Sequence, residues 1–180
     1  IVVVGDGSNG SFNWDFAVVR YNPDGSLDSS FGGTGRVITQ LTGDYDGASA
    51  VAIQADGKIV VAGSRYNGAG GSSFAVVRYN PNGSLDTSFN GTGIVITSVG
   101  DSLQDYANSV AIQTDGKIVV AGNSVSGSIN NFALVRYNTN GSLDTTFNGT
   151  GKVITPVGNS NAVANSVAIQ SDGKIIAAGN

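Results

Sequence analysis

The sequence of 180 residues contains no cysteine, histidine, methionine or glutamate, and all 13 of its acidic residues are aspartate. Without histidine there is no Ser-His-Asp relay, and without cysteine there is no thiolate nucleophile and no zinc or iron–sulfur site of the usual type. Aspartate is the only remaining carboxylate acid, base or metal ligand. Catalysis would have to be that of an Asp-dependent lyase or hydrolase, and calcium is the natural metal. No paired carboxylates recur in a fixed frame, so we do not expect an enzyme.

Positive charge is also scarce. The nine lysines and arginines are scattered, and the formal net charge is −4. Nucleic acid requires a basic patch, so we expect no nucleic-acid partner. No apolar run approaches the roughly 20 residues that span a bilayer, and we expect no membrane insertion. Loops rich in Gly, Ser, Asn, Thr and Asp favour an extracellular or cell-surface location.

The chain consists almost entirely of repeats. The first segment reads FAVVRYNPDGSLDSSFGGTGRVIT at 16–39, FAVVRYNPNGSLDTSFNGTGIVIT at 74–97 and FALVRYNTNGSLDTTFNGTGKVIT at 132–155. A second segment, VAIQxDGKI, follows each copy at 51–59, 110–118 and 167–175. The first segments begin 58 residues apart. A unit of this kind cannot bury its apolar surface alone, so neighbouring units must stack.

Each unit predicts four short strands and no helix. In the second repeat, runs rich in β-branched and aromatic residues lie at 74–79, 94–97, 109–113 and 117–121. Asp115-Gly116 favours a type I′ hairpin between the last two runs. Several runs are apolar on both faces, as in sheets that are covered above and below. We predict an all-β fold of β-propeller-type blades, with a β-solenoid as the alternative.

The expected blades are three four-stranded antiparallel sheets at 16–63, 64–122 and 123–180. Residues 1–15 then form the fourth strand of a preceding blade and a loop, because Ile1–Gly5 matches Ile59–Gly63. A chain that starts in this strand is interpreted as an excerpt of a longer protein. Three blades are too few for an ordinary propeller. We expect completion by further repeats, by a homo-oligomer such as two copies closing one ring, or by an open polymer.

The first segment, F-A-[VL]-V-R-Y-N-x-[DN]-G-S-L-D-[ST]-[ST]-F, is followed in each unit by V-A-I-Q-x-D-G-K-I. This pairing resembles the delta-60 repeat family, bacterial modules described as β-propeller domains of unknown function. The resemblance covers nearly the whole chain. It implies a propeller-type blade of large, mostly extracellular or surface proteins, and it implies no known activity or catalytic residue.

The repeats differ mainly in two classes of connection, at 40–48, 98–107 and 156–164, and at 6–15, 64–73 and 123–131. In a four-stranded antiparallel blade both classes emerge on one face, which is therefore variable while the other face is constant. Exposed aromatic side chains beside carboxylates on a rigid scaffold suit a glycan or a surface protein. Loops without any constraint are the alternative. The candidate binding residues are Trp14, Asp44, Tyr45, Asp46, Arg65, Tyr66, Asp101, Asp105 and Tyr106.

The constant turn at 22–28, NPDGSLD, superficially resembles a calcium loop. Its copies hold fewer carboxylates, so calcium binding would be weak, and we expect no cofactor. We favour a structural role, in which Asx-turns use the Asn and Asp side chains and the last aspartate caps amides or pairs with an arginine. The expected pairs are Asp28 with Arg20, Asp86 with Arg78 and Asp144 with Arg136. Phe16, Tyr21, Phe31 and their copies are expected in the core between blades.

These observations favour a non-enzymatic structural scaffold that is completed by assembly. A glycan- or protein-binding propeller that uses the variable face is the alternative function. An Asp-dependent enzyme ranks third.

Overall fold

The computed structural model describes residues 1–8, 13–41, 45–68, 70–101 and 104–180. These residues form thirteen β-strands. None of the described residues belongs to a helix that is long and apolar enough to cross a membrane. The strands are β1 (Val2–Ser8), β2 (Trp14–Arg20), β3 (Arg36–Thr39), β4 (Asp46–Ile53), β5 (Ile59–Tyr66), β6 (Ser72–Tyr79), β7 (Ile94–Thr97), β8 (Asp105–Ile112), β9 (Ile118–Ser126), β10 (Ile129–Tyr137), β11 (Lys152–Thr155), β12 (Ala164–Ile169) and β13 (Ile175–Gly179).

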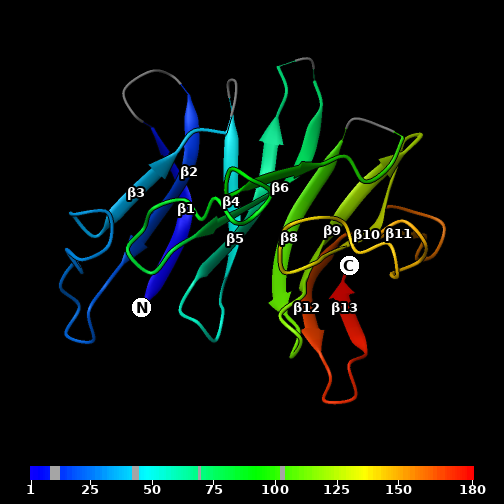
Figure 1. The fold of residues 1–180 in the computed structure, drawn as a ribbon. Helices are drawn as coiled ribbons and strands as arrows, with labels where there is room; N and C mark the ends of the chain where they lie inside the picture. Colours follow the sequence, from blue (N-terminus) through cyan, green and yellow to red (C-terminus); the bar gives the residue numbers. More distant parts are fainter. Residues whose placement is uncertain (9–12, 42–44, 69, 102–103) are drawn as a thin grey trace.

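The strands form four antiparallel sheets that follow one another across the molecule, from blue β1 to red β13 (Figure 1). The sheet orders are β1-β2-β3, β4-β5-β6-β7, β11-β10-β9-β8 and β12-β13. The first strands of successive sheets lie against one another, because β1 contacts β4, β4 contacts β8 and β8 contacts β12. The prediction of an all-β fold built from propeller-type blades is confirmed.

The grouping of strands into sheets differs from the expected blade bounds. The expected bounds placed all four strands of one repeat in one sheet. Instead, β5 pairs with β6 over eight residue pairs, from Ile59 opposite Tyr79 to Tyr66 opposite Ser72. The four-stranded sheets therefore span 46–97 and 105–155, and β1 belongs with β2 and β3 rather than with a preceding blade. The reason is the short connection after β5, which forms a hairpin closed by Asn67 N–H donating to Gly71 O at 3.0 Å.

Each inner sheet is apolar on both sides because alternate residues face opposite neighbours. In the second sheet, Val60, Ala62, Phe74 and Val76 face the following sheet. Their neighbours in sequence, Ile59, Val61, Ala75 and Val77, face the preceding sheet. The core is thus a series of layers between sheets, and every layer requires a sheet on either side.

The Asp-Gly hairpins differ from the predicted type I′ turn. Gly57 N–H donates to Gln54 O and Gln54 N–H donates to Lys58 O, both at 2.9 Å. Only Gly57 has a positive φ, of 83°, while Asp56 keeps a negative φ and its carboxylate accepts a bond from Lys58 N–H. This is a three-residue loop in which a type I turn is followed by a left-handed glycine. The copies at Gly116 and Gly173 have the same φ and the same hydrogen bonds.

Candidate functional site

The predicted binding residues divide between a cleft, the protein interior and isolated surface positions. Asp44 lies outside the described residues. Asp46 and Asp105 are completely buried. Their Oδ2 atoms accept backbone bonds from Leu41 N–H at 3.2 Å and Val99 N–H at 2.7 Å. These two equivalent aspartates therefore fix the connections that enter β4 and β8, and they do not belong to an exposed surface.

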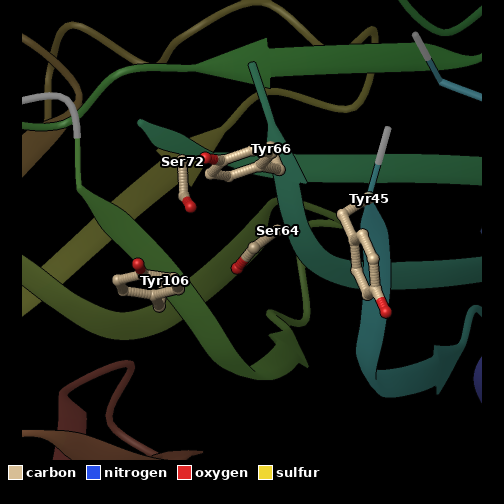
Figure 2. Close-up of a pocket in the computed structure, with 6 residues that line it drawn as sticks. Tyr45, Ser64, Tyr66, Ser72 and Tyr106 are labelled. Atoms are coloured by element: carbon tan, nitrogen blue, oxygen red, sulfur yellow. The ribbon is translucent and has the colours of Figure 1, made fainter. Parts of the chain in front are cut away.

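Three of the predicted tyrosines line one cleft at the variable end of the sheets (Figure 2). Tyr45 precedes β4, Tyr66 ends β5 and Tyr106 lies in β8, so the cleft spans the second and third sheets. Its volume is about 320 Å³. The remaining lining residues are Gly47, Ser64 and Ser72. We call this feature the tyrosine cleft.

The lining of the tyrosine cleft is neutral, because it combines tyrosine rings and hydroxyls with two serines and a glycine. Ser64 Oγ accepts a bond from Ala107 N–H at 3.1 Å, which ties β5 to β8 beneath the cleft. The serines were not among the predicted site residues. Ser64 could have been found from strand alternation, because it lies two residues before Tyr66 and therefore on the same side of β5.

Trp14, Arg65 and Asp101 do not line the cleft. The Trp14 ring lies beside Tyr45 with a centroid separation of 6.2 Å and an interplanar angle of 35°. Residues 14 and 45 also form a parallel backbone bridge between the first and second sheets. Trp14 thus packs beside the Tyr45 ring without lining the cleft itself. Arg65 is half-buried in β5, and Asp101 is exposed in the connection between β7 and β8.

The constant turns are held by ion pairs and Asx-turns, as predicted. Arg78 Nε contacts Asp86 Oδ2 at 2.7 Å, and the guanidinium lies 4.5 Å from the centre of the Phe89 ring. Lys58 Nζ reaches the same Asp86 oxygen at 3.1 Å. Burial alone would raise the pKa of Asp86, but hydrogen bonds from Ser88 and Lys58 outweigh it and hold the pKa well below its usual range. The first and third repeats form the same arginine pairs.

The oxygen atoms of the calcium-like turn bond to the turn itself. Asp24 Oδ1 accepts bonds from Ser26 N–H at 2.9 Å and from Ser26 Oγ at 2.6 Å. Asn82 and Asn140 bond Ser84 and Ser142 in the same way. Within the described ranges, no group of three or more carboxylates is placed to hold a metal ion. Weak calcium binding stays a prediction.

Three polar contacts join the first sheet to the second, and the same three contacts join the second sheet to the third. Tyr79 Oη donates to Thr39 Oγ1 at 2.7 Å, and Tyr137 Oη donates to Thr97 Oγ1 at 2.8 Å. The Arg20 and Arg78 guanidiniums donate to the backbone oxygens of Pro81 and Thr139. Gly32 N–H donates to Asn82 O at 2.9 Å, and Asn90 N–H donates to Asn140 O at 2.8 Å.

A close packing contact accompanies these bonds. Gly83 lies against the Phe31 ring, where a methyl group on the glycine would come within 3.0 Å of the ring. Gly141 lies against the Phe89 ring in the same way, at 2.9 Å. Both rings are completely buried. The turns of the second and third repeats therefore pack on the phenylalanine of the repeat before them.

The two end sheets expose the equivalents of buried interface residues. Ile1 is 73% exposed, whereas its equivalent Ile59 is 1% exposed. At the other end, Phe147 is half-buried although Phe89 is completely buried. A depression beside Phe147 is lined by Leu134, Arg136, Phe147, Val153, Gly173, Lys174, Ile175 and Ala177. Gly25, the first-repeat equivalent of Gly83, has no atom within contact distance of a methyl group built on it.

A comparison with curated protein sequences finds no match to the chain. A family model described as a domain of unknown function (DUF5122) beta-propeller matches residues 1–31, 54–89 and 113–147. The matched segments contain the strand pairs β1 and β2, β5 and β6, and β9 and β10, two of the three Asp-Gly hairpins, and the constant turns. They cover more than half of the chain and agree with its stacked antiparallel sheets, and the chain therefore belongs to the DUF5122 β-propeller family.

Proposed function

We propose that this β-propeller-type domain is a non-enzymatic, extracellular scaffold module that is completed by pairing its end sheets with like repeats. The pairing unit is a further repeat of the same protein or a second copy of the chain. The composition of the loops supports the extracellular location, and the lack of histidine, cysteine and glutamate supports a structural role. The narrower identification as a delta-60 repeat remains part of this proposal.

The observation that carries the proposal is that each end presents one half of the contacts that join the inner sheets. Tyr21 is equivalent to Tyr79 and Tyr137, and Thr155 is equivalent to their partners Thr39 and Thr97. Neither Tyr21 nor Thr155 makes this side-chain bond within the described chain. A head-to-tail arrangement brings the two halves together.

The constant turns at the two ends are also complementary: the turn of the third repeat lacks a partner that the turn of the first repeat can supply. The Arg136 guanidinium has no partner carbonyl of the kind that Arg20 and Arg78 bind in the described chain. The turn at 22–25 carries the equivalent carbonyls, and in the proposed pairing Gly25 would pack on the Phe147 ring as Gly83 packs on Phe31. Covering Phe147, Leu134 and Val153 also removes apolar surface from water. Pairing of two copies thus repeats an interface that the chain already contains.

The strand positions determine how a second copy would join. β13 of one copy is equivalent to β1 of the joining copy. Both strands would pair with the same edge of β2 in the joining copy, so only one of them can occupy that position. One of these strands must give way to the other, because each already packs one face into a core cluster, β13 through Ile175 and Ala177 and β1 through Val2 and Val4. Such an interface is heterologous, so it leads to a ring if the rotation closes and to a polymer if it does not.

Sedimentation velocity of the 180-residue chain over a range of concentrations tests this function. We expect association that increases with concentration. Val19→Asp places a charge on the N-terminal end sheet, and Phe147→Asp places one at the C-terminal end of the array, in the turn between β10 and β11. Each variant alone should remain monomeric, while an equimolar mixture should form dimers that do not grow, because each copy contributes its one intact end.

Ile129→Asp is the matched control, because Ile129 is exposed at the start of β10, at the opposite end of that strand from the constant turn that carries Phe147. This variant should associate like the unchanged chain. A chain that stays monomeric at every concentration would contradict the proposal. Dimers of Val19→Asp alone would instead indicate pairing of two C-terminal ends.

A further inference from the structure

The six tyrosines of the chain fall into two groups. Tyr21, Tyr79 and Tyr137 occupy the same position in the three repeats, and they belong to the framework. The other three tyrosines break the repeat. Tyr45, Tyr66 and Tyr106 are the three that line the tyrosine cleft.

The blade does not require an aromatic residue at any of these three positions. Gln104 and Asn161 occupy the position of Tyr45, and Ser8 and Val125 occupy that of Tyr66. Gly47 and Val163 occupy the position of Tyr106. The pairing of β8 with β9 at Tyr106 has the same form as the pairing of β4 with β5 at Gly47. Three separate departures from the repeat have therefore placed tyrosine around one cavity.

The chemistry of the lining narrows the class of ligand. An anion would require cationic side chains, and the described residues of the lining include none. A wholly apolar ligand requires an enclosed pocket, whereas Tyr45 is 53% exposed and Tyr106 is 40% exposed. Tyrosine combines a flat apolar face with a hydrogen-bonding hydroxyl, and the two serines add further hydroxyls. A sugar ring has the matching pattern of an apolar C–H face bordered by hydroxyl groups.

We propose that the tyrosine cleft binds a neutral oligosaccharide. Figure 2 shows the rings of Tyr45, Tyr66 and Tyr106 arranged around Ser64. Tyr45 and Tyr106, the two exposed rings, provide the faces on which sugar rings stack. Tyr66 and Ser72 provide hydroxyls at the border of the cleft. The volume of about 320 Å³ lies within the usual range for small-molecule sites.

Trp14 provides an intrinsic signal for this binding. It is the only tryptophan in the chain, and its ring centroid lies 6.2 Å from that of Tyr45. A sugar stacked on Tyr45 changes the surroundings of this pair, so we expect a saturable change in tryptophan fluorescence. The cleft lies within one chain. The titration can therefore be repeated with Phe147→Asp, which separates ligand binding from association between copies.

The probes are neutral linear oligosaccharides of glucose, mannose, galactose and N-acetylglucosamine, presented on an array and then titrated in solution. We expect at least one of them to bind. Tyr45→Ala and Tyr106→Ala should each weaken that binding about tenfold, which is the effect of losing one aromatic contact. Both side chains are exposed, so the thermal unfolding midpoint should not change. Isothermal calorimetry replaces fluorescence for Tyr45→Ala, because this substitution alters the environment of Trp14.

Two further variants complete the test. Tyr106→Phe keeps the ring and should retain most of the affinity. Val163→Ala changes the equivalent of Tyr106 outside the cleft and should have no effect. The proposal is overturned if none of the oligosaccharides binds, or if binding survives both alanine substitutions. Preferential binding of acidic oligosaccharides, or of tetramethylammonium as an aromatic-cage ligand, would also overturn it.

Discussion

The hydroxyl of Tyr79 is buried between the first and second sheets, where it donates to Thr39 Oγ1. Burial raises the pKa of Tyr79 to about 12, so the phenol stays protonated as a donor. We expect Tyr79→Phe to lower the free energy of unfolding by about 1–2 kcal/mol, because the Thr39 hydroxyl loses its partner. Urea unfolding measures this change. Tyr21→Phe is the matched control, because Tyr21 is equivalent to Tyr79 but makes no such bond. An equal loss of stability in both variants would contradict the role assigned to the Tyr79 hydroxyl.

Acid should weaken the turns that join the sheets. A hydrogen bond from the Thr146 hydroxyl is the main cause that lowers the pKa of Asp144 to about 2, with further help from Lys117 and Arg136. The carboxylate therefore stabilises the fold above its unfolded pKa of about 4, and this stability is lost as the pH falls toward 2. Thermal unfolding between pH 5 and pH 2 should show a falling midpoint. Asp144→Asn should show a smaller fall over that range, and an identical fall would contradict this account.

Residues that depend on local contacts could be predicted from the sequence. The pairs of Asp86 with Arg78 and of Asp144 with Arg136 lie within one turn and its strand, so the repeated spacing was sufficient. Asp46 and Asp105 were predicted at an exposed surface and are buried. Their burial depends on how the connections from β3 to β4 and from β7 to β8 pack against the sheets. No local sequence pattern predicts that packing.

At the scale of strands, position was easier to predict than pairing. β7 has the expected bounds of 94–97, and β3 and β11 occupy the equivalent positions, because β-branched runs and glycines mark these strands. The expected blades grouped the strands differently from the observed sheets, because strand propensity does not determine which strands become neighbours. The hairpin between β5 and β6 joins two repeats, and a repeat unit read from the sequence has no natural starting point. The tyrosine cleft depends on this same grouping, because it draws residues from four different strands or their ends.

The glycines of the constant turn provide a matched series for the contact between sheets. Gly25, Gly83 and Gly141 have φ values of 86°, 88° and 89°. Alanine at any of them should cost about 1–2 kcal/mol for the left-handed backbone. Gly83→Ala and Gly141→Ala should cost clearly more, because the added methyl group would collide with Phe31 or Phe89. Chemical denaturation of the three variants compares them directly, and equal losses would show that the ring contact contributes little.

At the scale of the whole molecule, both ends of the described array of sheets expose residues whose equivalents are buried between the inner sheets. An inner sheet such as β4-β5-β6-β7 is covered on both sides, whereas the end sheets repeat its residues with one side open to water. Ion pairs and caps inside a turn cannot compensate for this exposure, because they act within one repeat. Under the proposed pairing, another unit of the same kind completes the apolar layer and the three polar contacts, so the stability of the end sheets depends on that unit.

This dependence should make thermal stability vary with concentration. A partner that binds only the folded chain stabilises it by RT ln(1 + [L]/Kd), which is about 2.7 kcal/mol at one hundred times Kd. We therefore expect the thermal midpoint of the 180-residue chain to rise as its concentration rises through the association range found by sedimentation. Phe147→Asp should abolish the rise, and Ile129→Asp should preserve it. A midpoint independent of concentration, in a chain that sedimentation shows to associate, would mean that the contact forms between unfolded segments as readily as between folded end sheets.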